Sequence, residues 1–196
     1  MTEPDLQPTL EGPRVRLRPL APEDFDALYA VARDPLVWEQ HPDSDRHQLD
    51  VFTQLFEGGI RSRGALLVLD SASGEVVGSS RYYDWHPASR EIAIGYTFLG
   101  RKFWGGIYNR EVKHLMLGHA FGFADRVWFH VGARNLRSRR AMANVGARLA
   151  VEVPGDPAWR GGPGATAARP LHRPRGLRAL RVWRAHGGPG PDAQEL

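Results

Sequence analysis

The chain has 196 residues, no cysteine, and a formal net charge of +4 from 26 basic and 22 acidic residues. This length suits one hydrophobic core, and the absence of cysteine excludes disulfide frameworks, thiolate nucleophiles and cysteine-ligated metals. Neither a secretory leader nor an apolar run near the roughly 20 residues of a membrane span is recognisable, so we expect a cytoplasmic protein.

The first half of the chain predicts two helices among strands. Residues 14–20 alternate apolar and basic side chains, which is typical of a strand with one wet face. Pro22 and the two acidic residues after it suit the first turn of a helix, which Asp34-Pro35 ends. The expected elements are, in order, a strand at 14–20, a helix from Pro22 to Asp34, a helix around 49–56, and a hairpin of strands at 65–70 and 75–83.

The second half predicts a strand at 91–97, a helix after Asn109, a strand at 127–131, and a helix from Asn135 to Gly146. In the helix after Asn109, apolar residues recur at Val112, Leu115, Met116 and Ala120, and we expect Arg110, Glu111 and Lys113 on the opposite, solvated side. This order of elements predicts an α/β fold of the α+β kind, with helices packed on a mixed sheet.

The segment from Lys102 to Asn109 reads Lys-Phe-Trp-Gly-Gly-Ile-Tyr-Asn and joins a strand to a helix. The first amides of a helix have no intrahelical acceptor and carry the positive end of its dipole. A double glycine there lets a phosphate approach the backbone, so the segment is a candidate anion-binding loop. The alternative is a tight strand-to-helix turn that needs glycine and binds nothing.

We divide the chain into an N-terminal extension at 1–13, one domain at 14–150, and a tail at 151–196. The tail holds seven arginines and four acidic residues, with seven prolines and eight glycines, and we expect it to be largely irregular. Only residues 177–183 show a brief apolar pattern. Its arginines could engage nucleic acid, but they lack interleaved aromatic residues, and we do not expect such a partner.

Five motifs in this order resemble the GNAT acetyltransferases, in the branch of the ribosomal-protein-alanine N-acetyltransferases. The resemblance covers residues 14–150, about three quarters of the chain. The motifs are Arg14-Val-Arg-Leu-Arg-Pro-Leu with Pro22-Glu-Asp, Gly74-Glu-Val-Val-Gly-Ser, Gly95-Tyr-Thr-Phe-Leu, Trp104-Gly-Gly-Ile-Tyr-Asn, and Asn135-Leu-Arg-Ser-Arg-Arg-Ala-Met ending in Val145-Gly-Ala.

The resemblance implies acetyl-CoA as co-substrate. The family's pyrophosphate motif falls on Lys102, Gly105 and Ile107, of which only the central glycine matches. Main-chain groups of Thr97, Phe98 and Leu99 would hold the pantetheine, with the strand at 127–131 opposite. The set implied to bind the cofactor is Thr97, Phe98, Leu99, Lys102, Gly105, Gly106, Ile107, Tyr108, Asn109 and Asn135.

Ser138 and Glu91 are the candidate catalytic residues. By the resemblance, Ser138 would donate a proton to the departing thiolate; the alternative is that Asn135 and Ser138 only cap their helix. Glu91 would accept the proton of the incoming ammonium, directly or through water; the alternative is an exposed carboxylate at a strand end. His114, His119 and His130 lack the spacing of metal ligands, and we expect no metal.

Members of the family continue with two strands that close the sheet. The proline and glycine content after Val151 argues against central strands, so we expect these C-terminal strands to be missing or altered, as a shifted reading frame near Leu149 would cause. The predicted function is transfer of acetyl from acetyl-CoA to a primary amine, either a protein N-terminus or a small molecule, by a monomer or homodimer. The alternative is an acyl-CoA-binding or inactive remnant of such an enzyme.

Overall fold

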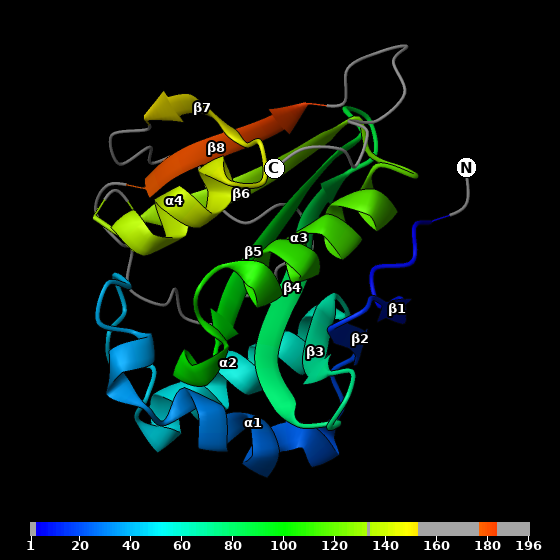
Figure 1. Ribbon diagram of the computed structural model, residues 1–196. Coiled ribbons are helices and arrows are strands. Elements are labelled where there is room, and N and C mark those ends of the chain that lie inside the picture. The colour runs from blue at the N-terminus through cyan, green and yellow to red at the C-terminus, as the bar shows by residue number, and fades with distance from the viewer. Residues whose placement is uncertain (1–2, 133, 153–176, 184–196) are drawn as a thin grey trace.

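One mixed sheet organises the protein. The structure, a computed structural model, describes residues 3–132, 134–152 and 177–183 (Figure 1). In this part of the chain, eight strands pair in the order β1-β2-β3-β4-β5-β6-β8-β7. Their bounds are β1 Leu10–Glu11, β2 Val15–Pro19, β3 Ala65–Asp70, β4 Val76–His86, β5 Glu91–Leu99, β6 Arg126–Gly132, β7 Arg148–Glu152 and β8 Leu177–Trp183.

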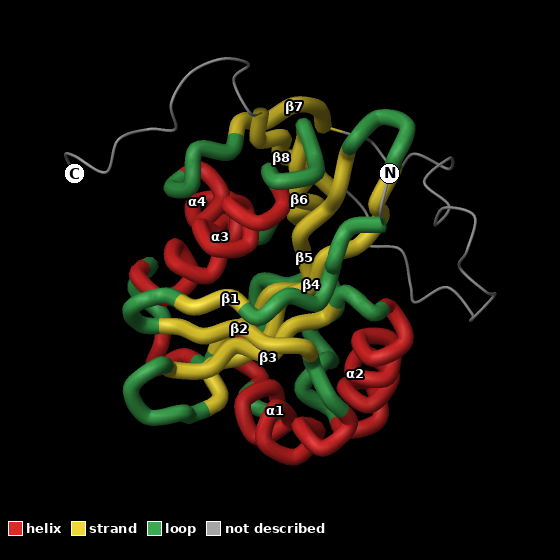
Figure 2. The backbone as a smooth tube through the Cα atoms, turned by 90° about the vertical axis from the view of Figure 1, so that its right-hand side faces the viewer, coloured by secondary structure: helices red, strands yellow, loops and turns green. Residues whose placement is uncertain are grey.

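Helices cover both faces of this sheet. Figure 2 shows α3 and α4 on one face and α1 and α2 on the other. The helices are α1 Phe25–Ala32, α2 Leu49–Ser62, α3 Ile107–Ala120 and α4 Leu136–Ala143, with short 3-10 turns at Pro22–Asp24, Pro35–Val37 and Arg101–Phe103. This arrangement confirms the predicted mixed α/β architecture. Among the described helices, none has the length and apolarity that crossing a bilayer requires.

Each face of the sheet has its own apolar cluster. Ile92, Ile94 and Phe129 pack with Val112 and Met116 beneath α3. On the other face, a second cluster joins α1 and α2 to the sheet through Leu28, Phe52, Phe56, Leu67 and Phe98. Alternating residues of β4 and β5 therefore belong to different faces, as the period of a strand requires.

β5 contains a bulge and then parts from β6. Ser79 pairs with Phe98 but Arg81 pairs with Gly95, so β5 has an extra residue there, and Tyr96 takes a φ of 52°. β5 and β6 are parallel and pair from Glu91 with Arg126 to Ala93 with Trp128. Within the described residues they make no pair beyond that point. The second half of β5 thus presents a main-chain edge to an opening, which we call the β5–β6 split.

The expectation that the tail would not supply the closing strands is corrected by the structure. β8 pairs with β6 along its whole length, from Trp183 opposite Arg126 to Leu177 opposite Gly132, and β7 pairs with β8. β8 coincides with the one apolar pattern of the tail. The proline- and glycine-rich stretches that argued against strands are at 153–176 and 184–196, outside the described residues. The proposed division into 1–13, 14–150 and 151–196 stays a prediction.

Three further expectations about helices are corrected. α2 continues to Ser62 rather than ending near Phe56. Gly58 and Gly59 interrupt its sequence pattern, but a side chain on Gly59 would come within 3.0 Å of Arg81, so the glycine serves close packing on β4. α3 begins at Ile107, which places Tyr108 and Asn109 in its first turn. Lys113, expected on the solvated side of α3, is only 1% exposed.

Candidate active site

The glycine loop has the backbone that an anion-binding site needs. Gly105 and Gly106 have φ values of 107° and 100°, which other residues rarely adopt, and Gly106 is the N-cap of α3 without a side-chain cap. Within the described residues, no amide from Gly105 to Asn109 donates to a protein acceptor, whereas the Arg110 amide bonds to the Gly106 carbonyl at 2.9 Å. These amides are therefore available to a ligand.

A cleft of about 360 Å³ borders this loop. It is lined by Pro13, Arg14, Asp70, Ala72, Trp104, Gly105, Ile107 and Tyr108. The Tyr108 hydroxyl donates to Asp70 at 2.7 Å, and this bond, with those from Ser73, lowers the pKa of Asp70 to about 2. Ile107, at the start of α3, is 50% exposed.

Lys102, the predicted phosphate ligand, lies in the 3-10 turn before the loop. Its ammonium pairs with Glu75 at the start of β4. Trp104 lies between the turn and the loop, and its indole N–H donates to the Leu99 carbonyl at 2.9 Å. The loop amides are thus free while the lysine is engaged, so the backbone is the stronger part of this candidate site.

Thr97, Phe98 and Leu99 form the edge of β5 at the split. The Thr97 side chain lies on the α3 face, where its hydroxyl bonds to Ser80 at 2.7 Å. Phe98 joins the cluster of α1 and α2, and Leu99 joins the one beneath α3. Phe98 and Leu99 pair with Ser79 and Gly78 of β4 on one side, and the other edge of this segment faces the split.

Lys113 reaches from α3 into this region, a placement that sequence reasoning missed. Its ammonium donates to Thr97 Oγ1 at 2.5 Å and to Ser80 Oγ at 3.3 Å, and it lies 5.5 Å from the centre of the Phe129 ring on β6. The contacts join the three strands around the split. Burial lowers the pKa of Lys113 from 10.5 to about 7.

On the opposite face, Tyr83 and His130 join β4 to β6 across β5. The Tyr83 hydroxyl bonds to His130 Nδ1 at 2.7 Å. A side chain on Gly95 would come within 2.9 Å of the Tyr83 ring, so the glycine admits this ring against β5. Burial lowers the pKa of His130 and keeps the pKa of Tyr83 well above its ordinary value. The pair is therefore neutral at neutral pH.

Glu91 lies at the paired end of β5 and β6, away from the split. Its carboxylate accepts from the Trp128 indole at 2.9 Å and also pairs with Arg126. The Glu91 side chain is 16% exposed, so it is not the exposed carboxylate of the alternative interpretation.

Asn135 and Ser138 begin α4 as a cap. Asn135 Oδ1 accepts from the Ser138 amide at 3.0 Å, which confirms the N-cap. The guanidinium of Arg137 lies 3.9 Å from the centre of the Trp104 ring, so the first turn of α4 contacts the glycine loop. The structure therefore brings Asn135, Ser138, the loop and the β5 edge to one side of the sheet, with Glu91 farther along the strands.

No set of three or more His, Cys, Asp or Glu side chains in the described part of the chain could hold a metal. The groups that the described residues bring to this region are free amides, hydroxyls, a neutral imidazole and two buried basic side chains, Lys113 and Arg81.

Comparison with known proteins gives a consistent result. Residues 14–148 match a family model described as an acetyltransferase (GNAT) domain. The fold is similar to a GCN5-related N-acetyltransferase from Brucella melitensis, with 22% identity, a TM-score of 0.74, and coverage of 90% of this chain and 79% of that one. Among curated proteins, none matches this sequence.

Two similar structures contain coenzyme A. Mycobacterium smegmatis RimJ in complex with CoA-disulfide is 20% identical, with a TM-score of 0.65 and coverage of 93% of this chain and 90% of that one. Spermidine N-acetyltransferase from Vibrio cholerae, in complex with CoA and spermine, is 12% identical, with a TM-score of 0.63 and coverage of 88% and 96%.

Proposed function

The chain belongs to the GNAT acetyltransferase family, and we propose that it moves an acetyl group from acetyl-CoA to a primary amine. The acceptor amine would be a protein N-terminus or a small molecule. The observation that carries the proposal is the run of unbonded amides from Gly105 to Asn109 beside a cleft, next to a β5 edge that β6 leaves open.

These groups fit a cofactor with a diphosphate and an extended arm. The amides at the start of α3, with the positive end of its dipole, would bind the diphosphate. The open edge of Thr97, Phe98 and Leu99 would pair with amide groups of the arm, as an added strand does. When bound, acetyl-CoA would supply the acetyl group as a reactive thioester.

A proton must leave the incoming ammonium, because only a neutral amine attacks a carbonyl carbon. We propose that His130, held by Tyr83, takes this proton, since its imidazole is neutral and lies on the face of β5 opposite α3. Glu91 stays a prediction for the same role, acting at a distance through water. Ser138 stays a prediction as the donor to the thiolate, because its amide is capped by Asn135 while no described group bonds its hydroxyl.

Calorimetry with acetyl-CoA tests the donor site. Gly105→Val places a branched side chain on a backbone with φ of 107°, so the loop must rearrange, and we expect affinity to fall about tenfold or more. Gly118→Ala is the control, because Gly118 lies farther along α3 with open space around an added side chain, and this variant should bind as the wild type does. Absence of binding by the wild type would overturn the proposal.

Thiol release with a panel of amines then separates an enzyme from a remnant that binds without turnover. In this assay His130→Gln should lower the rate at neutral pH more than Glu91→Gln does. A larger loss with Glu91→Gln would return the role of base to that residue. Binding without release from any amine would favour the remnant, for which the engagement of Lys102 by Glu75 is the specific observation.

A further inference from the structure

Arg81 is a buried cation without a carboxylate. It extends from β4 into the layer of α1 and α2 and is 9% exposed. One guanidinium nitrogen donates to the Leu55 carbonyl at 3.2 Å, whereas its Nε is buried without a hydrogen-bond partner. Among the described residues, no carboxylate lies within ion-pair distance of it. Buried charges in proteins are normally paired with an opposite charge, and the charge of Arg81 is not compensated in this way by the described residues.

A second arginine lies close to the first. The guanidinium groups of Arg81 and Arg46 lie 4.1 Å and 5.9 Å from the centre of the same Tyr96 ring. Arg46 pairs with Asp43 at 2.7 Å, so its charge is compensated by a carboxylate, whereas that of Arg81 is not among the described residues. The titratable groups that face Arg81 are Tyr96, Tyr83 and Arg46, and burial together with Arg46 lowers its pKa. We call Arg81, Arg46 and Tyr96 the arginine pair site.

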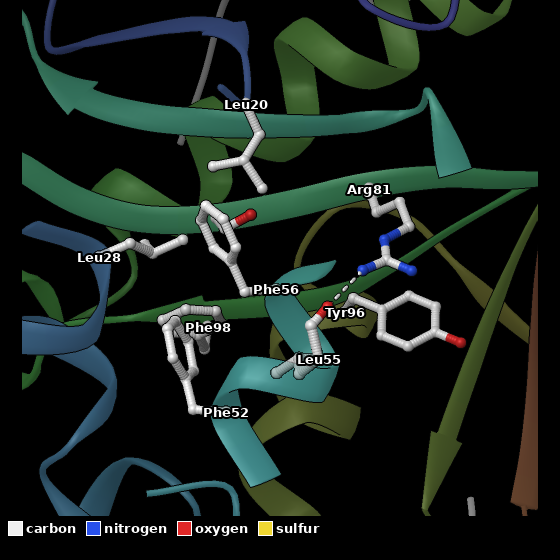
Figure 3. A pocket seen from close by; sticks show the side chains of 9 residues that line it. Leu20, Leu28, Phe52, Leu55, Phe56, Arg81, Tyr96 and Phe98 are labelled. Carbon is white, nitrogen blue, oxygen red and sulfur yellow. Dashed lines mark hydrogen bonds between the residues drawn. The ribbon is translucent and has the colours of Figure 1, made fainter. Parts of the chain in front are cut away.

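The space beside Arg81 has the size of one small polar group. The pocket has a volume of about 20 Å³. In Figure 3 the guanidinium bonds to Leu55 and lies against Tyr96. Such a volume holds about one water-sized group, such as a carboxylate oxygen, and not a whole ligand. Tyr96 is 39% exposed, so the rest of a ligand could extend past its ring to the surface.

The arginine pair site lies next to the proposed reaction centre. Arg81 is opposite Gly95 in the pairing of β4 with β5. Tyr83, which holds His130, is two residues along β4 on the same face, a separation of roughly 7 Å at the usual rise of a strand. An anion at Arg81 and an amine at His130 would therefore be a few bonds apart in one small molecule or one chain end.

We propose that the amine acceptor carries a carboxylate and that Arg81 and Arg46 bind it. This inference rests on the proposed acetyl transfer and narrows its substrate to acidic amines. A guanidinium offers several N–H groups in a plane and matches the two oxygens of a carboxylate. The carboxylate would supply both the missing acceptor for Nε and the missing negative charge.

Matched acceptors test this in the wild-type protein. β-Alanine is compared with its amide, and a peptide beginning Ala-Glu with one beginning Ala-Gln, at saturating acetyl-CoA. The carboxylate form should have a kcat/KM roughly tenfold or more above that of its amide. The peptide and amino-acid arms identify the source of the carboxylate, and spermine, a polycation, should be the poorest acceptor. Equal kcat/KM within both matched pairs would overturn the inference.

Variants assign the preference to residues. Arg81→Gln and Arg46→Gln should raise KM for the carboxylate form toward that of the amide, with the larger effect at Arg81. Arg61→Gln is the matched control, because Arg61 lies on α2 in an exposed pair with Glu57 and should change nothing. If Arg81→Gln does not fold, the inference is still tested by Arg46→Gln and by the comparison of acid and amide acceptors in the wild type. A preference that survives both substitutions counts against the inference.

Binding without turnover keeps the two proposals separate. Thermal unfolding of the CoA-bound protein is measured with each matched acceptor. Stabilisation by the carboxylate form alone supports the arginine pair site even if no acetyl is transferred, in which case only the proposed function fails. Transfer to amines with no difference between acid and amide, in rate or in stabilisation, overturns the inference and leaves the proposed function standing.

Discussion

Within the described part of the chain, each face of the sheet buries a basic side chain that has no carboxylate partner, and the two side chains differ in how they can respond to burial. On the α3 face, Lys113 lies among hydroxyls and the Phe129 ring. On the α1 and α2 face, Arg81 lies against Tyr96 with one bond to a carbonyl. A lysine can release its proton when burial makes the charge costly, whereas a guanidinium keeps its charge at any ordinary pH. The first face can thus become neutral by itself, and the second needs an anion.

The largest pH-dependent effect is expected at Lys113. The pKa of its amine is about 7 in the folded state, against 10.5 for the ordinary group. Below pH 7 both states are protonated and the fold bears the full penalty of the buried charge. Stability attributable to Lys113 then rises with pH between 7 and 10.5, because the unfolded state binds more protons there. Lys113→Met should therefore raise the free energy of unfolding by on the order of 3–5 kcal/mol at pH 6.

That gain should shrink as the pH rises and disappear near pH 10.5. Urea unfolding of both proteins at a series of pH values measures it. A gain that is the same at pH 6 and pH 10 would show that folding does not lower the pKa of Lys113, because the two states would then bind the same number of protons over this range.

A smaller effect is expected when a hydroxyl beside Lys113 is removed. Thr97→Val keeps the shape of the side chain but removes the acceptor at 2.5 Å from the ammonium. Loss of this hydrogen bond destabilises the charged ammonium of Lys113 more than the neutral amine. The pKa of Lys113 should therefore fall further, by about one unit. NMR titration of the Lys113 side chain measures this. Thr53→Val, on the exposed side of α2, is the control, and an equal shift in it would contradict the assignment.

The effect of substituting Arg81 on the free energy of unfolding should not depend on pH, in contrast to the effect of substituting Lys113. Its guanidinium stays protonated in both states across the accessible range, so Arg81→Met should change stability by the same amount at pH 6 and pH 10, within about 0.5 kcal/mol. The same urea series measures it. A difference as large as the one expected for Lys113 would mean that the two faces are not distinct in this respect.

The sequence was sufficient to predict the glycine loop, the order of the elements and the cap at Asn135, because these depend on local backbone chemistry. Sequence reasoning was wrong about which polar side chains are buried. Lys113 follows Val112 and precedes Leu117 by one turn, so it falls on the apolar stripe of α3, but lysines are so rarely buried that residue type outweighed position.

Arg81 is a similar case on a strand. It alternates with Ser79 and Tyr83 toward the α1 and α2 face, a position that the period of two already indicates. The two-residue period cannot predict that Arg81 lacks a carboxylate partner among the described residues, because this depends on segments far away in the chain. A contact across three strands is equally hidden from the sequence: Tyr83 and His130 meet only once β4 and β6 flank β5, whereas Glu91 stays a prediction for the base.

The position of β8 between β6 and β7 has a consequence for how the protein is made. β6 leaves β5 after Trp128, and the partner on its other edge is not synthesised until residues 177–183 emerge from the ribosome. The far wall of the split therefore waits for a segment about fifty residues downstream. During translation the nascent chain therefore carries a strand with one unpaired edge, and completion of this part of the sheet is timed by residues 177–183 rather than by the segment that contains the glycine loop.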